Sequence, residues 1–67
     1  MKVTSCDNKE FTVGDQVFNY YDMRLGTITS EPENDGWFYF TDTDNFKKFL
    51  NGERICSIET ATKKGWL

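Results

Sequence analysis

Gly36-Trp37-Phe38-Tyr39-Phe40 is the densest apolar run of the chain. Its four consecutive aromatic residues favour a β-strand, because large rings pack well across neighbouring strands. Side chains alternate along a strand, so we expect Trp37 and Tyr39 on one face and Phe38 and Phe40 on the other. A strand with rings on both faces belongs either to a sheet that curls over itself or to a sheet with one face against a partner.

Length and composition predict a single small domain over residues 1–67. A chain of this size buries only about 60% of the surface that its unfolded form exposes, so its core is small. The aromatic content of 16% offsets part of this deficit. Each buried ring removes about 150–250 Å² from water. Association into a homo-oligomer is another common compensation, and it stays an open alternative.

Charge and composition argue against a nucleic-acid-binding protein and against an enzyme. The formal net charge is -3, and an acidic chain lacks the excess of Lys and Arg that binds phosphates in nucleic acids. The chain has no histidine, the side chain most used for acid–base work near neutral pH and as a metal ligand. It also has no nucleophile motif, no Gly-rich phosphate loop and no spacing typical of metal ligands. We therefore expect a non-catalytic protein with no cofactor and no metal site.

The cysteine content and the hydropathy of the sequence indicate the cellular compartment in which the protein is expected. Cys6 and Cys56 lie near opposite ends of the chain, whereas small secreted domains are usually dense in disulfides. We expect two reduced thiols, and a single Cys6–Cys56 bridge is the alternative. Residues 1–5 are not followed by the apolar segment of a signal peptide, and no run approaches the roughly 20 apolar residues of a membrane span. These features predict a soluble, cytoplasmic protein with no membrane partner.

Short strand-like segments with turn signals between them occupy most of the chain. A loop is expected over residues 31–36, which hold the only proline and an Asp-Gly pair. Five or six short strands without a long helix predict an all-β barrel or sandwich. Before residue 46, the sequence predicts a hairpin over residues 2–13 and strands over 16–21, 25–30 and 36–40.

Residues 46–58 allow two interpretations. An apolar pattern at i, i+3 and i+4 within residues 46–50 suits one turn of helix. Asn51-Gly52 is also the strongest two-residue hairpin signal, which would join 46–50 to a strand over 53–58. We favour the hairpin, with Asn51 and Gly52 at positive φ in a type I′ turn, because the segment is too short for a stable helix.

Two motifs resemble the opening of small SH3-like barrels of the KOW and Tudor type. They are Val13-Gly14-Asp15-Gln16-Val17 and Leu25-Gly26-Thr27-Ile28. In these modules a Gly-Asp-x-Val strand precedes a loop, and a Gly-x-Ile or Gly-x-Val strand leads away from it. The first glycine allows a tight entry, and the second lets the strand coil sharply where the barrel closes.

This resemblance implies an all-β, five-stranded SH3-like barrel with an extra N-terminal hairpin strand. The barrel core would cover about residues 11–58, followed by a polar tail or short last turn over 59–67. The compact, acidic chain is also similar in form to small accessory proteins of phages and bacteria.

Four aromatic residues are candidates for binding a partner: Tyr20, Tyr21, Trp37 and Tyr39. Tudor-like barrels hold methylated lysine or arginine between such rings through cation–π attraction, and the resemblance implies a similar cage. The alternative is that these rings belong to the core or to its edge. Trp37 is the strongest candidate, because it directly follows the predicted loop over residues 31–36, which is rich in acidic residues.

Glu31, Glu33 and Asp35 alternate along the predicted loop. Their spacing does not match a calcium-binding EF-hand, so we expect no metal there. Such acids form either a solvated edge that aids solubility or a surface for a basic partner.

Most of the positive charge lies in the last third of the chain, at Lys47, Lys48, Arg54, Lys63 and Lys64. The predicted hairpin would bring Lys47, Lys48 and Arg54 close together among aromatic residues, where they would contact RNA or DNA. KOW-type barrels bind nucleic acid in this way. The alternative is a set of solvated charges that protects an edge strand.

The sequence therefore favours a non-catalytic module that binds another protein. Trp37, the Tyr20–Tyr21 pair and the acidic loop over residues 31–35 are the expected contacts. Binding of nucleic acid or a ribonucleoprotein through a KOW-like basic face is the alternative. Net acidity favours a protein partner, whereas a segregated basic face would favour nucleic acid.

Overall fold

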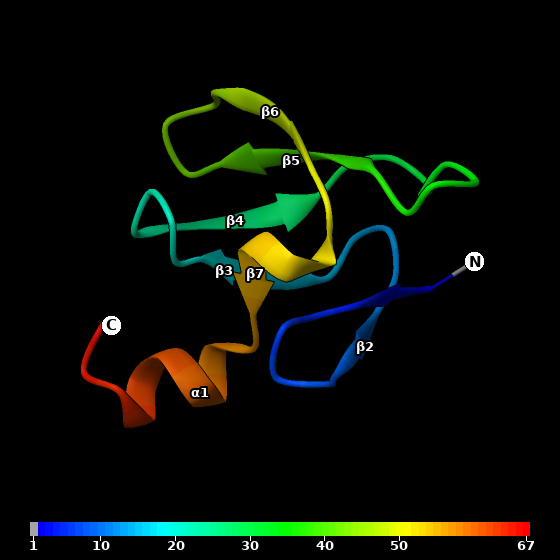
Figure 1. Cartoon of the computed structure of the whole chain (residues 1–67). Coiled ribbons are helices and arrows are strands. Elements are labelled where there is room, and N and C mark those ends of the chain that lie inside the picture. The colour runs from blue at the N-terminus through cyan, green and yellow to red at the C-terminus, as the bar shows by residue number, and fades with distance from the viewer. Residues whose placement is uncertain (1) are drawn as a thin grey trace.

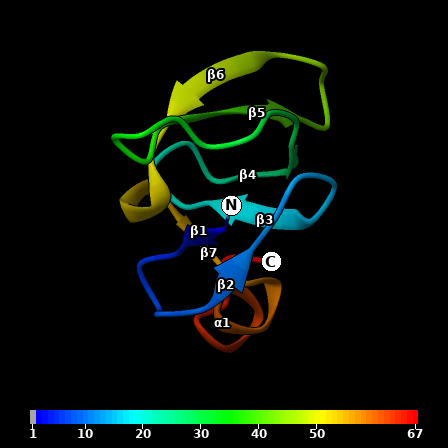
Figure 2. The same ribbon diagram turned by 90° about the vertical axis from the view of Figure 1, so that its right-hand side faces the viewer.

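A computed structural model describes residues 2–67; Met1, which the predicted domain includes, lies outside the described residues. The chain forms a five-stranded antiparallel sheet, a separate two-stranded hairpin, one 3-10 turn and one short α-helix (Figure 1). The sheet curls into a half-barrel, and the hairpin and the helix lie at its lower end (Figure 2). The predicted all-β class is confirmed.

The first hairpin was expected over residues 2–13, and it is confirmed. It consists of β1 (Val3–Thr4) and β2 (Glu10–Phe11), which pair antiparallel with Val3 opposite Phe11. The turn between them is closed by a 2.8 Å hydrogen bond from the Ser5 amide to the Lys9 carbonyl. Its polar residues suit a turn, and Asn8 adopts a positive φ of 64° that asparagine tolerates.

The larger sheet has the strand order β6-β5-β4-β3-β7, and all its pairs are antiparallel. The strands predicted over 16–21, 25–30 and 36–40 are present but shorter or shifted by a few residues. The bounds are β3 (Gln16–Asn19), β4 (Arg24–Ile28), β5 (Phe38–Asp42), β6 (Lys47–Leu50) and β7 (Ile55–Cys56).

The concave face of this sheet holds the main core. Its members are buried apolar side chains from five strands of the sheet and from β1, with Phe11 packed against them: Val3, Val17, Ile28, Phe38, Phe40, Leu50 and Ile55. The β1–β2 hairpin therefore contributes to the core through Val3. Residues outside the expected 11–58 core take part in burying it.

Strand β5 shows the predicted alternation of rings. Phe38 and Phe40 are 0% and 1% exposed and lie in the core, whereas Tyr39 is 42% exposed on the opposite face. Gly26 on the neighbouring strand makes room for Phe40, because an added Cβ would overlap the Phe40 ring and the Thr41 carbonyl oxygen. A glycine in a strand often marks such a close approach.

The segment predicted as a polar tail or short last turn forms a short helix. Helix α1 (Ile58–Lys63) begins at Ser57, whose hydroxyl accepts a hydrogen bond from the Thr60 amide. Ser is a favoured N-cap residue because it satisfies an amide that the helix cannot. Ala61 of this helix is fully buried against Phe18. The helix therefore covers part of the convex face of the sheet.

The predicted Asn51-Gly52 hairpin is wrong. Strand β6 does form, but it pairs with β5, while β7 pairs with β3 at the other edge of the sheet. The connection is the 3-10 turn η1 (Gly52–Arg54), and Asn51 caps it with φ -116° and a side-chain oxygen that accepts from the Glu53 amide. Asparagine thus acts through its capping side chain, and the positive φ of a type I′ turn is absent.

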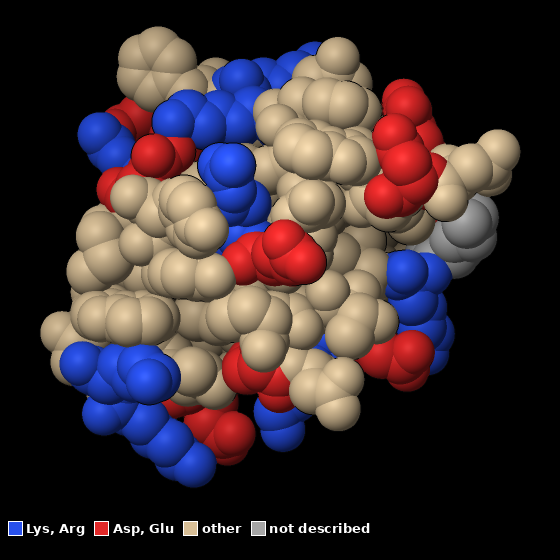
Figure 3. Space-filling model, viewed as in Figure 1, with Lys and Arg blue, Asp and Glu red and all other residues tan. Residues whose placement is uncertain are grey.

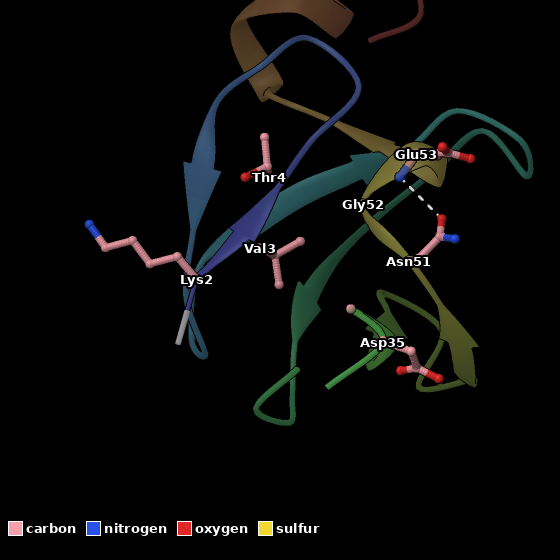
Figure 4. Close-up of a pocket in the computed structure, with 8 residues that line it drawn as sticks. Lys2, Val3, Thr4, Asp35, Asn51, Gly52 and Glu53 are labelled. Carbon is pink, nitrogen blue, oxygen red and sulfur yellow. Dashed lines mark hydrogen bonds between the residues drawn. The ribbon is translucent and has the colours of Figure 1, made fainter. Parts of the chain in front are cut away.

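Gly52 is required for a different reason. A Cβ at this position would overlap the carbonyl oxygen of Thr4, because η1 packs closely against β1. Figure 4 shows Thr4 and Gly52 on these two neighbouring elements. Backbone atoms cannot move aside as a flexible side chain can. The glycine therefore allows the chain to cross from β6 to β7 in close contact with the first hairpin.

Gly52→Ala should destabilise the fold by about 2 kcal/mol, as expected when an added methyl group overpacks a close contact. Gly52→Asn shows whether Gly52 is needed to avoid overlap with Thr4 or to adopt a positive φ. Asparagine tolerates the positive φ of a type I′ turn, but its Cβ would still overlap Thr4. We expect Gly52→Asn to be at least as damaging as Gly52→Ala in urea denaturation. Near-wild-type stability for Gly52→Asn would contradict the close contact with Thr4.

Asp7 joins the first hairpin to the start of α1. Its carboxylate accepts hydrogen bonds from the Ser57 hydroxyl at 2.7 Å, the Ser57 amide at 3.1 Å and the Thr60 hydroxyl at 2.6 Å. The Ser5 hydroxyl also donates to it. Burial alone would raise the pKa of Asp7, but these donors stabilise the charged form and hold its pKa well below the usual value.

Asp7→Asn should lower the stability at pH 7 by about 2 kcal/mol, because the charged acceptor of several hydrogen bonds is lost. A lowered folded pKa adds stability above the unfolded pKa of about 3.9, and this contribution is lost as the pH falls toward the folded value. The wild type should therefore lose more stability than Asp7→Asn between about pH 5 and pH 2.

Thermal unfolding across this pH range measures the effect. Glu33→Gln is the control, because it removes one negative charge from an exposed loop and should keep wild-type stability at pH 7. Parallel pH profiles for the wild type and Asp7→Asn would contradict a stabilising role for the Asp7 carboxylate.

Candidate functional site

Three rings form a cluster on the convex face of β5 and β6. Trp37 stacks on Phe49 with ring centroids 5.6 Å apart, and Tyr39 lies 4.9 Å from Phe49. The strand register explains the cluster, because Tyr39 is directly opposite Phe49 and paired residues share a face. We call Trp37, Tyr39 and Phe49 the aromatic patch. Phe49 is 44% exposed, so the patch faces solvent.

The same convex face is covered at the other end of the sheet. Phe18 on β3 is buried there with Cys56 beneath Ala61 of α1, and Trp66 stacks on Phe18 at 6.1 Å. No element of the described chain covers the aromatic patch in the same way (Figures 1 and 2). The patch is thus the uncovered half of a face whose other half is buried.

The acidic loop is attached directly to Trp37. The Glu33 amide donates to the Trp37 carbonyl at 2.8 Å, and the Trp37 amide donates to a carboxylate oxygen of Asp35 at 3.2 Å. Gly36 closes this tight turn with a positive φ of 87°. The loop therefore holds the exposed acids Glu31, Glu33 and Asp35 at one side of the aromatic patch.

Tyr20 and Tyr21 belong to a second cluster, away from Trp37 and Tyr39. Tyr20 stacks on Trp66 at 5.6 Å and meets Tyr21 edge-on at 5.0 Å. Both tyrosines follow β3, whereas Trp37 precedes β5, and the register places these positions at opposite ends of their strands. The four predicted rings therefore do not line one common cage.

The predicted cations are dispersed. Lys47 lies over the Tyr39 ring at 5.3 Å, and Lys48 forms an ion pair with Asp22. Arg54 lies over Tyr21 at 4.3 Å, and Lys64 lies over Trp66 at 5.7 Å, near Lys63 at the end of α1. Figure 3 shows blue side chains in separate groups, at the top over β6 and at the lower left near the C-terminus.

Lys47, Lys48 and Arg54 were expected together only if the Asn51-Gly52 hairpin formed. Because β6 and β7 lie at opposite edges of the sheet, Arg54 is separated from the two lysines. Phe49 and Trp66 were absent from the predicted partner-binding set, although each is a central ring of its cluster. Their roles depend on strand register and on contacts between distant parts of the chain.

The two cysteines are free thiols that differ in exposure. The Cys6 amide donates to the Ile55 carbonyl at 3.0 Å, which places Cys6 beside β7. Burial raises the pKa of Cys56 to about 11, and the neighbouring Cys6 and Asp7 add to this shift. Burial and a hydrogen bond with Cys6 raise the pKa of Tyr20 to about 12. Neither Cys56 nor Tyr20 is therefore activated for chemistry near neutral pH.

A thiol-reactive probe should modify Cys6 rapidly and Cys56 only after unfolding, because Cys56 is buried and its raised pKa leaves little thiolate at pH 8. Mass spectrometry of the alkylated native protein measures the two rates separately. Equal rates at both residues would contradict the burial of Cys56. A lack of reaction until a reductant is added would contradict the assignment of both cysteines as free thiols.

One hollow of the surface lies between β1, η1 and the acidic loop. Its volume is about 360 Å³, and its lining includes Asp35, Glu53 and Lys2. In the close-up, Lys2 extends away from the two acids, so the charged groups do not converge on one point (Figure 4). Within residues 2–67, no group of three possible ligands is placed to hold a metal ion.

Comparison with protein-family models, with curated proteins and with solved structures found no match. Over residues 2–67, the only α-helix is far too short to cross a bilayer.

Proposed function

We propose that this protein is a non-catalytic binding module that recognises another protein through the aromatic patch. The supporting observation is the uncovered cluster of Trp37, Tyr39 and Phe49 on a face whose other end is covered by α1 and Trp66. Exposed clusters of large rings are characteristic of interaction sites, and Trp and Tyr are the side chains most enriched among interface anchors.

Charge around the patch supports a protein partner. The acids of the 31–35 loop lie on one side and Lys47 lies on the other, so the surface carries both signs. Mixed charges around an apolar centre orient a protein partner and speed its encounter.

The dispersion of the cations weighs against the nucleic-acid alternative. Lys48 is paired with Asp22, and Lys47, Arg54 and Lys64 each lie over a ring in separate places. A nucleic-acid backbone is normally bound by a continuous basic track. The net charge of -3 opposes such binding further.

We also propose that the half-barrel is SH3-like and that the protein acts in the cytoplasm as a small accessory protein. Two glycines of the quoted motifs support the first point, because Gly14 turns at a positive φ of 97° before β3 and Gly26 receives the Phe40 ring. Free thiols at Cys6 and Cys56 support the second point.

Phe49→Ser should abolish partner binding while the protein stays folded, because Phe49 contacts both other rings of the patch and is partly exposed. The expected loss is about 2 kcal/mol or more of binding free energy, mainly through faster dissociation. Phe46→Ser is the matched control, since Phe46 is 63% exposed, lies just before β6 and has no ring partner among the described residues.

Affinity capture from cells of the source organism identifies the partner, and surface-based kinetics with the purified partner then compares the variants. Circular dichroism and thermal unfolding confirm that each variant is folded. Equal binding by Phe49→Ser and Phe46→Ser would contradict the proposal. Salt-sensitive capture of nucleic acid, lost on changing Arg54 or Lys64, would establish the alternative instead.

Neutralising the acidic loop should slow association with a basic partner. The variant combines Glu31→Gln, Glu33→Gln and Asp35→Asn, and Asn keeps an oxygen that accepts from the Trp37 amide. We expect an association rate about tenfold lower at low salt, with a weaker salt dependence and little change in dissociation. An unchanged association rate would show that the loop does not steer the partner.

A further inference from the structure

The two edges of the five-stranded sheet differ in accessibility. Strand β7 is one edge, and the segment that contains Cys6 lies along it through the 3.0 Å bond from the Cys6 amide to the Ile55 carbonyl. Strand β6 is the other edge, and both ribbon views show no described segment beyond it (Figures 1 and 2). An uncovered edge is a template for an additional strand.

The hydrogen-bond register shows which groups of β6 face outward. The Asp42 amide donates to the Phe46 carbonyl at 2.9 Å, so this pair is hydrogen-bonded. Hydrogen-bonded pairs alternate along an antiparallel ladder, which makes Lys48 and Leu50 the next residues whose backbone groups point toward β5. The amides and carbonyls of Lys47 and Phe49 therefore point away from β5, toward the open edge.

The same two residues present their side chains to the convex face. Lys47 is opposite Thr41 and Phe49 is opposite Tyr39, so both belong to the face of the aromatic patch. Within residues 2–67, no carboxylate lies at ion-pair distance from Lys47, which only faces the Tyr39 ring. An added strand would thus meet an exposed ring and an uncompensated ammonium group two residues apart.

We propose that the partner docks as an additional antiparallel strand on β6, using an extended segment that carries an apolar residue followed two positions later by an acidic residue. The apolar side chain packs on Phe49 and extends the aromatic patch, and the carboxylate pairs with Lys47. Both partner residues exchange backbone hydrogen bonds with the outward-facing groups of these positions. This inference rests on the proposed binding function and specifies its geometry.

A second copy of the chain fits this edge less well. Two β6 strands would bring Lys47 and Lys48 of each copy to one seam, and lysines at an edge oppose such self-pairing. An acidic segment instead supplies the charge that Lys47 lacks.

The first test selects binders from a displayed library of random short peptides with the full chain as bait. We expect enrichment of the apolar-x-acidic pattern. Lys47→Glu should shift the preference at the last position from acidic to basic residues, because the charge opposite it is reversed. Lys63→Glu makes the same charge change on α1 and should leave the selected pattern unchanged.

The second test uses synthetic versions of a selected peptide with one methylated backbone nitrogen each. Methylation at the apolar or the acidic position removes an amide that points at β6, and should weaken binding by about tenfold or more. Methylation at the position between them blocks an amide that points to solvent, and should have little effect. This pattern is specific to strand addition and needs no change to the protein.

Several outcomes would overturn the inference. They are selection without the expected pattern, uniform effects of methylation, and a dimer in solution that Lys47→Pro dissociates, which would show that a second copy occupies the edge. If methylation has uniform effects but Phe49→Ser still abolishes binding, the patch functions without strand addition. If the selected peptides bind the Phe49→Ser variant as tightly as the wild type, they bind outside the aromatic patch and the proposed function itself fails.

Discussion

The packing of Phe40 against Gly26 links the fold of this protein to its candidate site. Without a side chain at Gly26, β4 and β5 accommodate the Phe40 ring on the concave face, where Phe38 is also buried. Because side chains alternate along a strand, burying these two rings places Trp37 and Tyr39 on the convex face. The exposed patch is therefore a direct consequence of how the core is formed.

The chain covers one half of that convex face and leaves the other half open. Helix α1 and Trp66 bury Phe18 on β3, whereas the rings of the aromatic patch pack on one another and stay partly exposed. The exposed rings, the acidic loop and the open edge of β6 lie next to one another, which gives a partner several kinds of contact in one place.

Local patterns in the sequence predicted the elements well, because they depend on neighbouring residues. The first hairpin and the alternation of rings in β5 were predicted from turn residues and strand periodicity alone. The Asn51-Gly52 turn was predicted wrongly because its conformation depends on packing against Thr4, which is distant in sequence. Phe49 could not be assigned to the patch without the register of β6 on β5, and Trp66 could not be assigned without the position of α1.

The most direct test of the proposed binding surface is a measurement of intermolecular nuclear Overhauser effects to the ring protons of the protein in its partner complex. We predict contacts to Trp37, Tyr39 and Phe49, with none to Tyr21 or Trp66 in the second cluster. Contacts confined to Tyr21 and Trp66, beside Arg54 and Lys64, would contradict it and assign binding to the opposite end of the sheet.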